Sequence, residues 1–151
     1  MTATAAWAPL IDTHVHVFER GLPLVTGATA SPAYDFNAPD LIAHLDREGV
    51  IFCVLTAPSF LGTYADIVEP DVEPTVLRAM ADAGVVGVRF SLRRYPELPD
   101  FTRPEWQRLL RRVRDLDWYI HMLAESERMA PMIPLLDKSG VKLVIDHYGV
   151  P

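Results

Sequence analysis

The sequence of 151 residues contains a single cysteine, Cys53, so the chain cannot form an internal disulfide. A protein without disulfides is typical of a reducing compartment, and we therefore expect a cytoplasmic protein. No run approaches the roughly 20 apolar residues that a membrane-spanning helix needs, and residues 1–10 lack the basic and apolar segments of a secretory leader. We therefore expect neither a membrane span nor a targeting segment.

Basic residues are also scarce, because 14 Lys and Arg stand against 20 Asp and Glu, for a formal net charge of -6. That balance disfavours nucleic acid or an anionic membrane as the main partner, although a local anion site stays compatible with it. Disorder is excluded by the composition, since half of the residues are hydrophobic and 23% are charged. The length suits one core, so we expect residues 1–151 to form a single domain.

Several common catalytic and binding motifs are missing. The sequence has no glycine-rich G-x-G-x-x-G or Walker loop, no G-x-S-x-G nucleophile elbow and no C-x-x-C pair. These absences remove the usual nucleotide-binding, serine-hydrolase and zinc-ribbon interpretations.

What the sequence has is an alternation of short β-branched runs with amphipathic segments. This pattern is typical of parallel strands joined by crossover helices, and it predicts an α/β protein. The best runs are apolar throughout, as expected of strands covered on both faces. The predicted strands are Leu10–Phe18, Val50–Ala57, Ile67–Glu69, Val85–Leu92, Trp118–Leu123 and Val141–His147.

The predicted helices are marked by proline near their starts and glycine after their ends. One of them opens with the capping-box pattern Thr102-Arg103-Pro104-Glu105. In the last, prolines 131 and 134 predict that the regular part begins late. The other predicted helices are Pro39–Glu48, Pro74–Ala83 and Ser126–Lys138.

The first predicted strand carries Asp12, His14 and His16 at alternate positions. Because strand side chains change face with a period of two, all three are expected on one side of the strand. Two neighbouring imidazoles on a rigid strand suit a divalent transition metal such as zinc. The alternative is a pair of partly buried histidines that are hydrogen-bonded to the backbone.

Two further histidines, His121 and His147, are predicted near the carboxyl ends of later strands, where ligands bind in parallel sheets. Arg89 is a charge within an apolar strand, and it is expected either to anchor a substrate carboxylate or to form a salt bridge with a buried acid. Arg94 follows in the next loop, where it is expected either to extend this anion site or to be solvated, and Ser59 after the second strand is a candidate for a substrate hydrogen bond.

Three segments together resemble the amidohydrolase superfamily, in the branch of 2-pyrone-4,6-dicarboxylate lactonase and related TIM-barrel hydrolases. They are Asp12 to Phe18, Gly87 to Phe90 and Asp146 to Pro151. The resemblance implies a (β/α)8 barrel in which His14, His16 and His121 bind one divalent metal, with zinc expected. It also implies catalytic roles for His121 and His147, while some members of this branch work without metal through histidines and arginines.

A complete barrel of this kind takes roughly 250 residues, so the resemblance implies an incomplete barrel with about five or six βα units. Only nine residues separate Ala57 from Ile67, which is short for a parallel crossover. The expected function is a hydrolase for a small carboxylated lactone or related cyclic carbonyl compound. The alternatives are a metal-dependent decarboxylase of the same superfamily and a non-catalytic partial barrel that forms a homo-oligomer or pairs through its open edges.

Overall fold

The computed structural model of the protein describes residues 9–26, 28, 30–58, 60, 69–93 and 95–150. These residues belong to two compact units, Met1–Leu61 and Gly62–Pro151, and each unit is described by itself. In both units the strands pair in parallel and alternate with helices along the chain. The prediction of an α/β protein with parallel strands is therefore confirmed.

The first unit consists of two parallel strands, β1 (Leu10–Val15) and β2 (Val50–Leu55), connected through helix α1 (Ala38–Glu48). Asn37 and Asp40 form a capping box at the start of α1, in which each side chain accepts a hydrogen bond from the backbone N–H of the other. The helix ends as predicted at Gly49, whose φ of 70° lies in the left-handed region that favours glycine.

Strand β1 is shorter than predicted, because it ends at Val15 and not at Phe18. Phe18 instead forms an isolated antiparallel bridge with Phe36. Each of these two residues donates its backbone N–H to the carbonyl of the other, at 2.9 Å. The long segment between β1 and α1 is therefore closed at its base by a pair of backbone hydrogen bonds.

The second unit is built on a three-stranded parallel sheet in the order β3-β4-β5. A 3-10 turn, Asp146–Gly149, follows the last strand. The strands are β3 (Gly87–Ser91), β4 (Tyr119–Leu123) and β5 (Lys142–Ile145). The helices are α2 (Pro74–Asp82), α3 (Pro104–Asp115), α4 (Ser126–Met129) and α5 (Ile133–Ser139).

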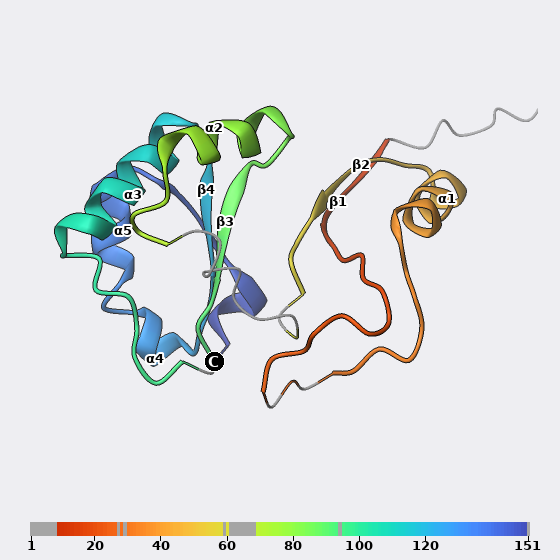
Figure 1. Ribbon diagram of the computed structural model, residues 1–151, viewed down its shortest axis with the longest axis horizontal. Helices are drawn as coiled ribbons and strands as arrows, with labels where there is room; N and C mark the ends of the chain where they lie inside the picture. The colour runs from red at the N-terminus through yellow and green to blue at the C-terminus, as the bar shows by residue number, and fades with distance from the viewer. Residues whose placement is uncertain are drawn as a thin grey trace, which may run out of the picture. The chain divides into compact units, whose positions relative to one another are not determined.

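One face of this sheet forms the hydrophobic core. Val88 and Phe90 on β3 and Ile120 and Met122 on β4 alternate along their strands and are at most 5% exposed. Helices α2, α3 and α5 lie on this side of the sheet in Figure 1. The opposite face, which we call the polar face, carries Arg89 on β3 and His121 on β4, together with the apolar Leu123 and Val144.

Gly87 begins β3 where the neighbouring strand comes very close. A Cβ atom at this position would lie 2.7 Å from the carbonyl oxygen of Tyr119 and equally close to its ring. Since backbone cannot move aside cheaply, only glycine fits here without displacing β4.

Several predicted boundaries differ from the structure. The fourth predicted helix is split into α4 and α5, because prolines 131 and 134 interrupt it, and its regular part begins late as expected. The capping box predicted at Thr102 is wrong: the Thr102 hydroxyl donates to the Asp100 carboxylate at 2.6 Å, and Arg103 precedes the helix without a side-chain cap. His147 lies in the 3-10 turn and not in β5.

The predicted strand Ile67–Glu69 falls outside the described residues except for Glu69, which belongs to no strand. Among the helices that the structure describes, none has both the length and the apolar character needed to cross a membrane.

The core on α3 predicts a clear contrast in stability. Leu109 is fully buried, so Leu109→Ala is expected to lower the free energy of unfolding by about 2 to 5 kcal/mol through lost burial and the cavity it leaves. Val76 on α2 is 43% exposed, so Val76→Ala is expected to change it by less than about 1 kcal/mol. Urea denaturation measures both, and equal losses would contradict this account of the core.

Candidate functional site

The polar face of the β3-β4-β5 sheet carries the candidate site of the second unit. In the parallel register Arg89 lies beside His121, and His121 lies beside Val144. Asp146 opens the 3-10 turn directly after β5 and follows Val144 by two residues. Because Ile145 between them still has an extended backbone, the side chain of Asp146 lies on the same face as that of Val144. Two strands and the turn that follows the third thus bring a guanidinium, an imidazole and a carboxylate together.

Asp146 is the centre of this cluster. Its side chain is 7% exposed, and its Oδ2 atom lies 2.5 Å from Nη2 of Arg89 and 3.5 Å from Nε2 of His121. His147 is more open, at 65% exposure, with its Nε2 atom 3.7 Å from Asp146 Oδ1. The backbone N–H of His147 also donates to Oδ1 at 3.2 Å. A buried carboxylate is thereby surrounded by one permanent cation and two imidazoles.

The electrostatic balance at Asp146 favours the ionised form. Burial by itself raises the pKa of the carboxyl, but the hydrogen bond and charge of Arg89 outweigh that effect. The charges of His121 and His147 lower the pKa further. The pKa of Asp146 therefore lies below its usual value of 3.8.

The backbone around His147 is unusual for residues with side chains. His147 and Tyr148 have φ angles of 46° and 55°, both in the left-handed region. Such conformations are uncommon outside glycine and persist only where the surroundings enforce them. This turn directs the chain away from β5 directly after Asp146.

The first unit holds the other predicted pair, His14 and His16. Their ring centroids are 4.9 Å apart in an edge-to-face arrangement. Nδ1 of His16 lies 2.6 Å from the carbonyl oxygen of Thr56, just after β2. Since a carbonyl only accepts, Nδ1 is the donor of this hydrogen bond, and Nε2 is the ring nitrogen that is not used in it.

The donor chemistry in each unit fits a transition-metal ligand set. A metal-binding histidine commonly donates its other ring N–H to a carbonyl, which is the arrangement of His16. In the second unit His121 offers an imidazole nitrogen beside a carboxylate oxygen, both of them good ligands of zinc. The residues present are therefore compatible with a divalent ion.

The sequence predictions have mixed outcomes at these positions. Arg89 forms the salt bridge with a buried acid, which was one of its two predicted roles, and its role toward substrate stays a prediction. Ser59 and Arg94 lie outside the described residues. Asp146 was not predicted as a site residue, although the expectation that Arg89 needs a buried acid, together with an acid at a strand end, was the signal for it. The contact of His16 with Thr56 could not be predicted from the sequence, because it is made by the backbone carbonyl of Thr56 and not by its side chain.

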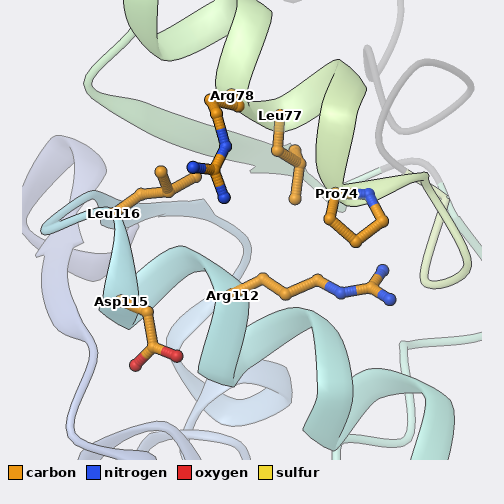
Figure 2. Close-up of a pocket in the computed structure, with 6 residues that line it drawn as sticks. All are labelled: Pro74, Leu77, Arg78, Arg112, Asp115 and Leu116. Atoms are coloured by element: carbon orange, nitrogen blue, oxygen red, sulfur yellow. The ribbon is translucent and has the colours of Figure 1, made fainter.

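A separate cavity of about 190 Å³ lies between α2 and α3 on the helical side of the second unit. Figure 2 shows Leu77 and Arg78 of α2 and Arg112 of α3 directed into this space. Pockets for organic ligands usually measure about 300 to 1,000 Å³ and contain convergent polar groups. None of the histidines or carboxylates described above lines this smaller cavity, and its one acidic lining residue is Asp115. The cavity is therefore not the candidate catalytic site.

Comparison with known proteins gives one family and several solved structures. The sequence profile of the amidohydrolase family matches residues 11–151. A search of curated proteins gave no significant match. The family match agrees with the resemblance carried by the sequence motifs.

The two most informative structures are described as 2-pyrone-4,6-dicarboxylic acid hydrolases. One, a probable enzyme from Acinetobacter baumannii solved with citric acid bound, is 29% identical with a TM-score of 0.80, and the match covers 92% of this chain and 58% of that one. The other, provisionally assigned and from Pseudomonas putida, is 33% identical with a TM-score of 0.74, covering 92% and 57%. The chain thus spans less than two thirds of either relative.

A third structure, of an Agrobacterium tumefaciens protein in its apo form, is 18% identical with a TM-score of 0.65. The match covers 92% of this chain and 56% of that chain, and at this identity it indicates a shared fold only. The partial overlap with all three agrees with the predicted incomplete α/β barrel architecture.

Because Arg89 and Asp146 form a buried ion pair, the effects of substituting them on the free energy of unfolding are expected to be strongly non-additive. Arg89→Met leaves an uncompensated carboxylate in the protein and is expected to cost about 3 to 5 kcal/mol of stability. The double variant Arg89→Met/Asp146→Leu is expected to recover most of that loss, because neither charge then remains buried alone. Urea denaturation gives the coupling. The exposed pair Arg103 and Glu105 provides the control, since Arg103→Met is expected to have little effect.

The lowered pKa of Asp146 predicts a particular dependence of stability on pH. Because the folded-state pKa is depressed, the ionised carboxylate stabilises the fold above the unfolded value of 3.8, and that contribution is lost as the pH falls through the folded value. The unsubstituted protein is therefore expected to lose Tm more steeply than Asp146→Asn below pH 3.8. Thermal denaturation followed by circular dichroism in the presence of a chelator measures this, and parallel profiles would contradict it.

Proposed function

The chain belongs to the amidohydrolase family, and on that premise we propose that the protein is a hydrolase acting on a small carboxylated lactone or related cyclic carbonyl compound. The observation that carries the proposal is the buried Asp146 carboxylate held between Arg89 and His121 beside the open ring of His147. Two relatives are described as hydrolases of 2-pyrone-4,6-dicarboxylic acid, and one of them was solved with citric acid, a tricarboxylate. Both facts favour a carboxylated substrate.

Lactone hydrolysis needs a proton acceptor for the attacking water and a proton donor for the ring oxygen. The water oxygen bonds to the carbonyl carbon, the ring C–O bond breaks, and the released oxygen takes a proton. His147 suits this transfer, because its ring is exposed and an imidazole nitrogen can take the proton from the attacking water and give it to the released ring oxygen. The ring of His147 lies beside the Asp146 carboxylate, and His121, on the other side of that carboxylate, is the second catalytic residue of the proposal.

Substrate carboxylates are the proposed ligands of Arg89, Arg94 and Ser59. A guanidinium presents a planar fork of five N–H donors that matches a carboxylate. Arg89 uses Nη2 toward Asp146, so binding of a substrate carboxylate there requires the two acids to share one guanidinium. In this proposal Arg89 has two roles: it pairs with Asp146 in the fold, and it binds a carboxylate of the substrate.

We further propose one divalent ion, with zinc the first candidate, bound by His14, His16 and His121. The family resemblance supports this ligand set, as does the carbonyl that orients the His16 ring. A zinc ion held by these residues would lower the pKa of its bound water toward about 7. A metal-free reaction that uses the same histidines and arginines is the alternative.

Two other functions are the alternatives, and the second has an observation in its favour. A decarboxylase of the same superfamily would use the same donor set, and it differs from the hydrolase in releasing carbon dioxide. A non-catalytic protein that self-associates is favoured by apolar side chains exposed on strands, since such surfaces tend to pair. They include Ile51, Phe52 and Leu55 on β2 and Val144 and Ile145 on β5. Light scattering that gives a monomer mass would count against self-association.

The hydrolase proposal predicts the effect of a histidine substitution. His16→Ala is expected to reduce kcat/KM for 2-pyrone-4,6-dicarboxylate or a muconolactone by about 100-fold or more, because a ligand or orienting ring is lost. His44→Ala is the matched control, since His44 is exposed on α1 and contacts Arg47. The loss of lactone absorbance measures the rate, and analysis of the products for carbon dioxide separates hydrolase from decarboxylase.

Metal removal completes this test. A chelator is expected to abolish activity in the unsubstituted protein, and added zinc is expected to restore it. Activity that persists after complete metal removal, confirmed by elemental analysis, would support the metal-free alternative. Undiminished hydrolysis by His16→Ala would contradict the assignment of this residue.

A further inference from the structure

The loop after β3 is fastened to the start of α4 by one side chain, that of Arg128. Its Nη1 atom donates to the carbonyl oxygens of Leu92 at 3.1 Å and Arg93 at 3.4 Å. Its Nη2 atom donates to the carbonyl oxygen of Tyr95. A single guanidinium therefore binds three backbone carbonyls of a four-residue segment.

A second side chain, that of Glu125 in the loop after β4, contacts both Arg128 and Arg93. We call Arg128 and Glu125 together the clasp. Its Oε2 atom lies 3.4 Å from Nη1 of Arg128, and its Oε1 atom accepts from Nε of Arg93 at 3.2 Å. The carboxylate thus holds both the clasping arginine and an arginine of the loop that is clasped. The Arg93 side chain remains 51% exposed, so its guanidinium is accessible to an anion in solution.

The clasp lies next to the candidate site along the chain. Residues 92–95 directly follow β3, which carries Arg89, and Glu125 comes two residues after β4, which carries His121. Both loops leave the carboxyl ends of their strands, where parallel sheets bind ligands. In the sequence, Arg93 is followed directly by a second cation, Arg94.

The loop carbonyls do not need Arg128 merely to have a hydrogen-bond donor. Loop carbonyls at a protein surface can bind water at little cost, and an exposed ion pair adds little stability. A fixed cationic loop has a different benefit, because a ligand that binds it does not have to order it first. The planar fork of Arg128 is the group best suited to hold several acceptors in a defined arrangement.

We propose that Arg128 and Glu125 are positioning residues that hold Arg93, together with the backbone of Leu92 and Tyr95, in place for recognition of a carboxylate of the substrate. The inference rests on the proposed function for the class of ligand, and it adds two residues that lie outside the predicted site. Neither of them contacts substrate or the reacting atoms in this assignment. Both act through the loop.

Two measurements on Arg128→Lys test the proposal. Lysine keeps the charge but lacks the fork, so hydrogen exchange of the peptide that covers residues 92–95 is expected to rise about tenfold. The Kd for citrate, measured by calorimetry, is expected to rise about fivefold or more, because the loop must then be ordered on binding. Arg103→Lys is the control, since Arg103 pairs with Glu105 on the surface, and neither quantity is expected to change.

Glu125→Gln gives an independent variant, in which the shape of the side chain is kept while the ion pairs with Arg93 and Arg128 are removed. The same two changes are expected at smaller size. If the unsubstituted protein hydrolyses a carboxylated lactone, KM is expected to rise in both variants while kcat changes by less than about twofold. This separation of KM from kcat would not follow from a general loss of folding.

The outcomes separate this inference from the proposed function. Failure of the unsubstituted protein to hydrolyse any lactone contradicts the proposed function alone, since hydrogen exchange and citrate binding need no turnover. Unchanged exchange in Arg128→Lys overturns the clasp, and raised exchange with unchanged citrate affinity overturns its role in recognition. Absence of citrate binding by the unsubstituted protein also overturns that role.

Discussion

A carboxylate that is nearly inaccessible to water, that of Asp146, imposes the strongest constraint on the second unit. Removing this charge from solvent is costly unless a cation pairs with it, and Arg89 on β3 supplies that cation at 2.5 Å. The two residues are 57 positions apart and meet only when β3, β4 and β5 pair in the observed register. A slip of one residue would turn the partner to the opposite face. The ion pair and the alignment of the sheet therefore depend on each other.

The same alternation that joins these charges also separates two tasks. Side chains such as Phe90 and Ile120 face the helices and form a dry core, while their neighbours Arg89 and His121 face the other way. The core can thus be rigid without any polar group in it. The site side chains are held in place by the same strands, because core and site residues alternate along one backbone. Strands are suited to this arrangement because consecutive residues serve different faces at fixed spacing.

The loops that leave the carboxyl ends of these strands show a second level of organisation. Arg128 binds three carbonyls of the loop after β3, and Ser126 donates to the carbonyl of Val150 at 3.3 Å after β5. The short helix α4 therefore contacts the segments that follow both neighbouring strands. Loops usually carry specificity in α/β proteins, and here the polar contacts of one short helix connect them. In the first unit, the bridge between Phe18 and Phe36 closes the loop after β1 in a comparable way.

From the sequence alone, the α/β class, most of the elements and the pairing of His14 with His16 were predictable, because apolar runs, prolines, glycines and a period of two are local signals. The need of Arg89 for a partner was predictable as well, because a charge in an apolar strand is costly. Its choice of Asp146, the loop contacts of Arg128 and the position of His147 in a left-handed turn were not. These features depend on strand register and on backbone carbonyls that are distant in sequence, so only the tertiary structure decided them.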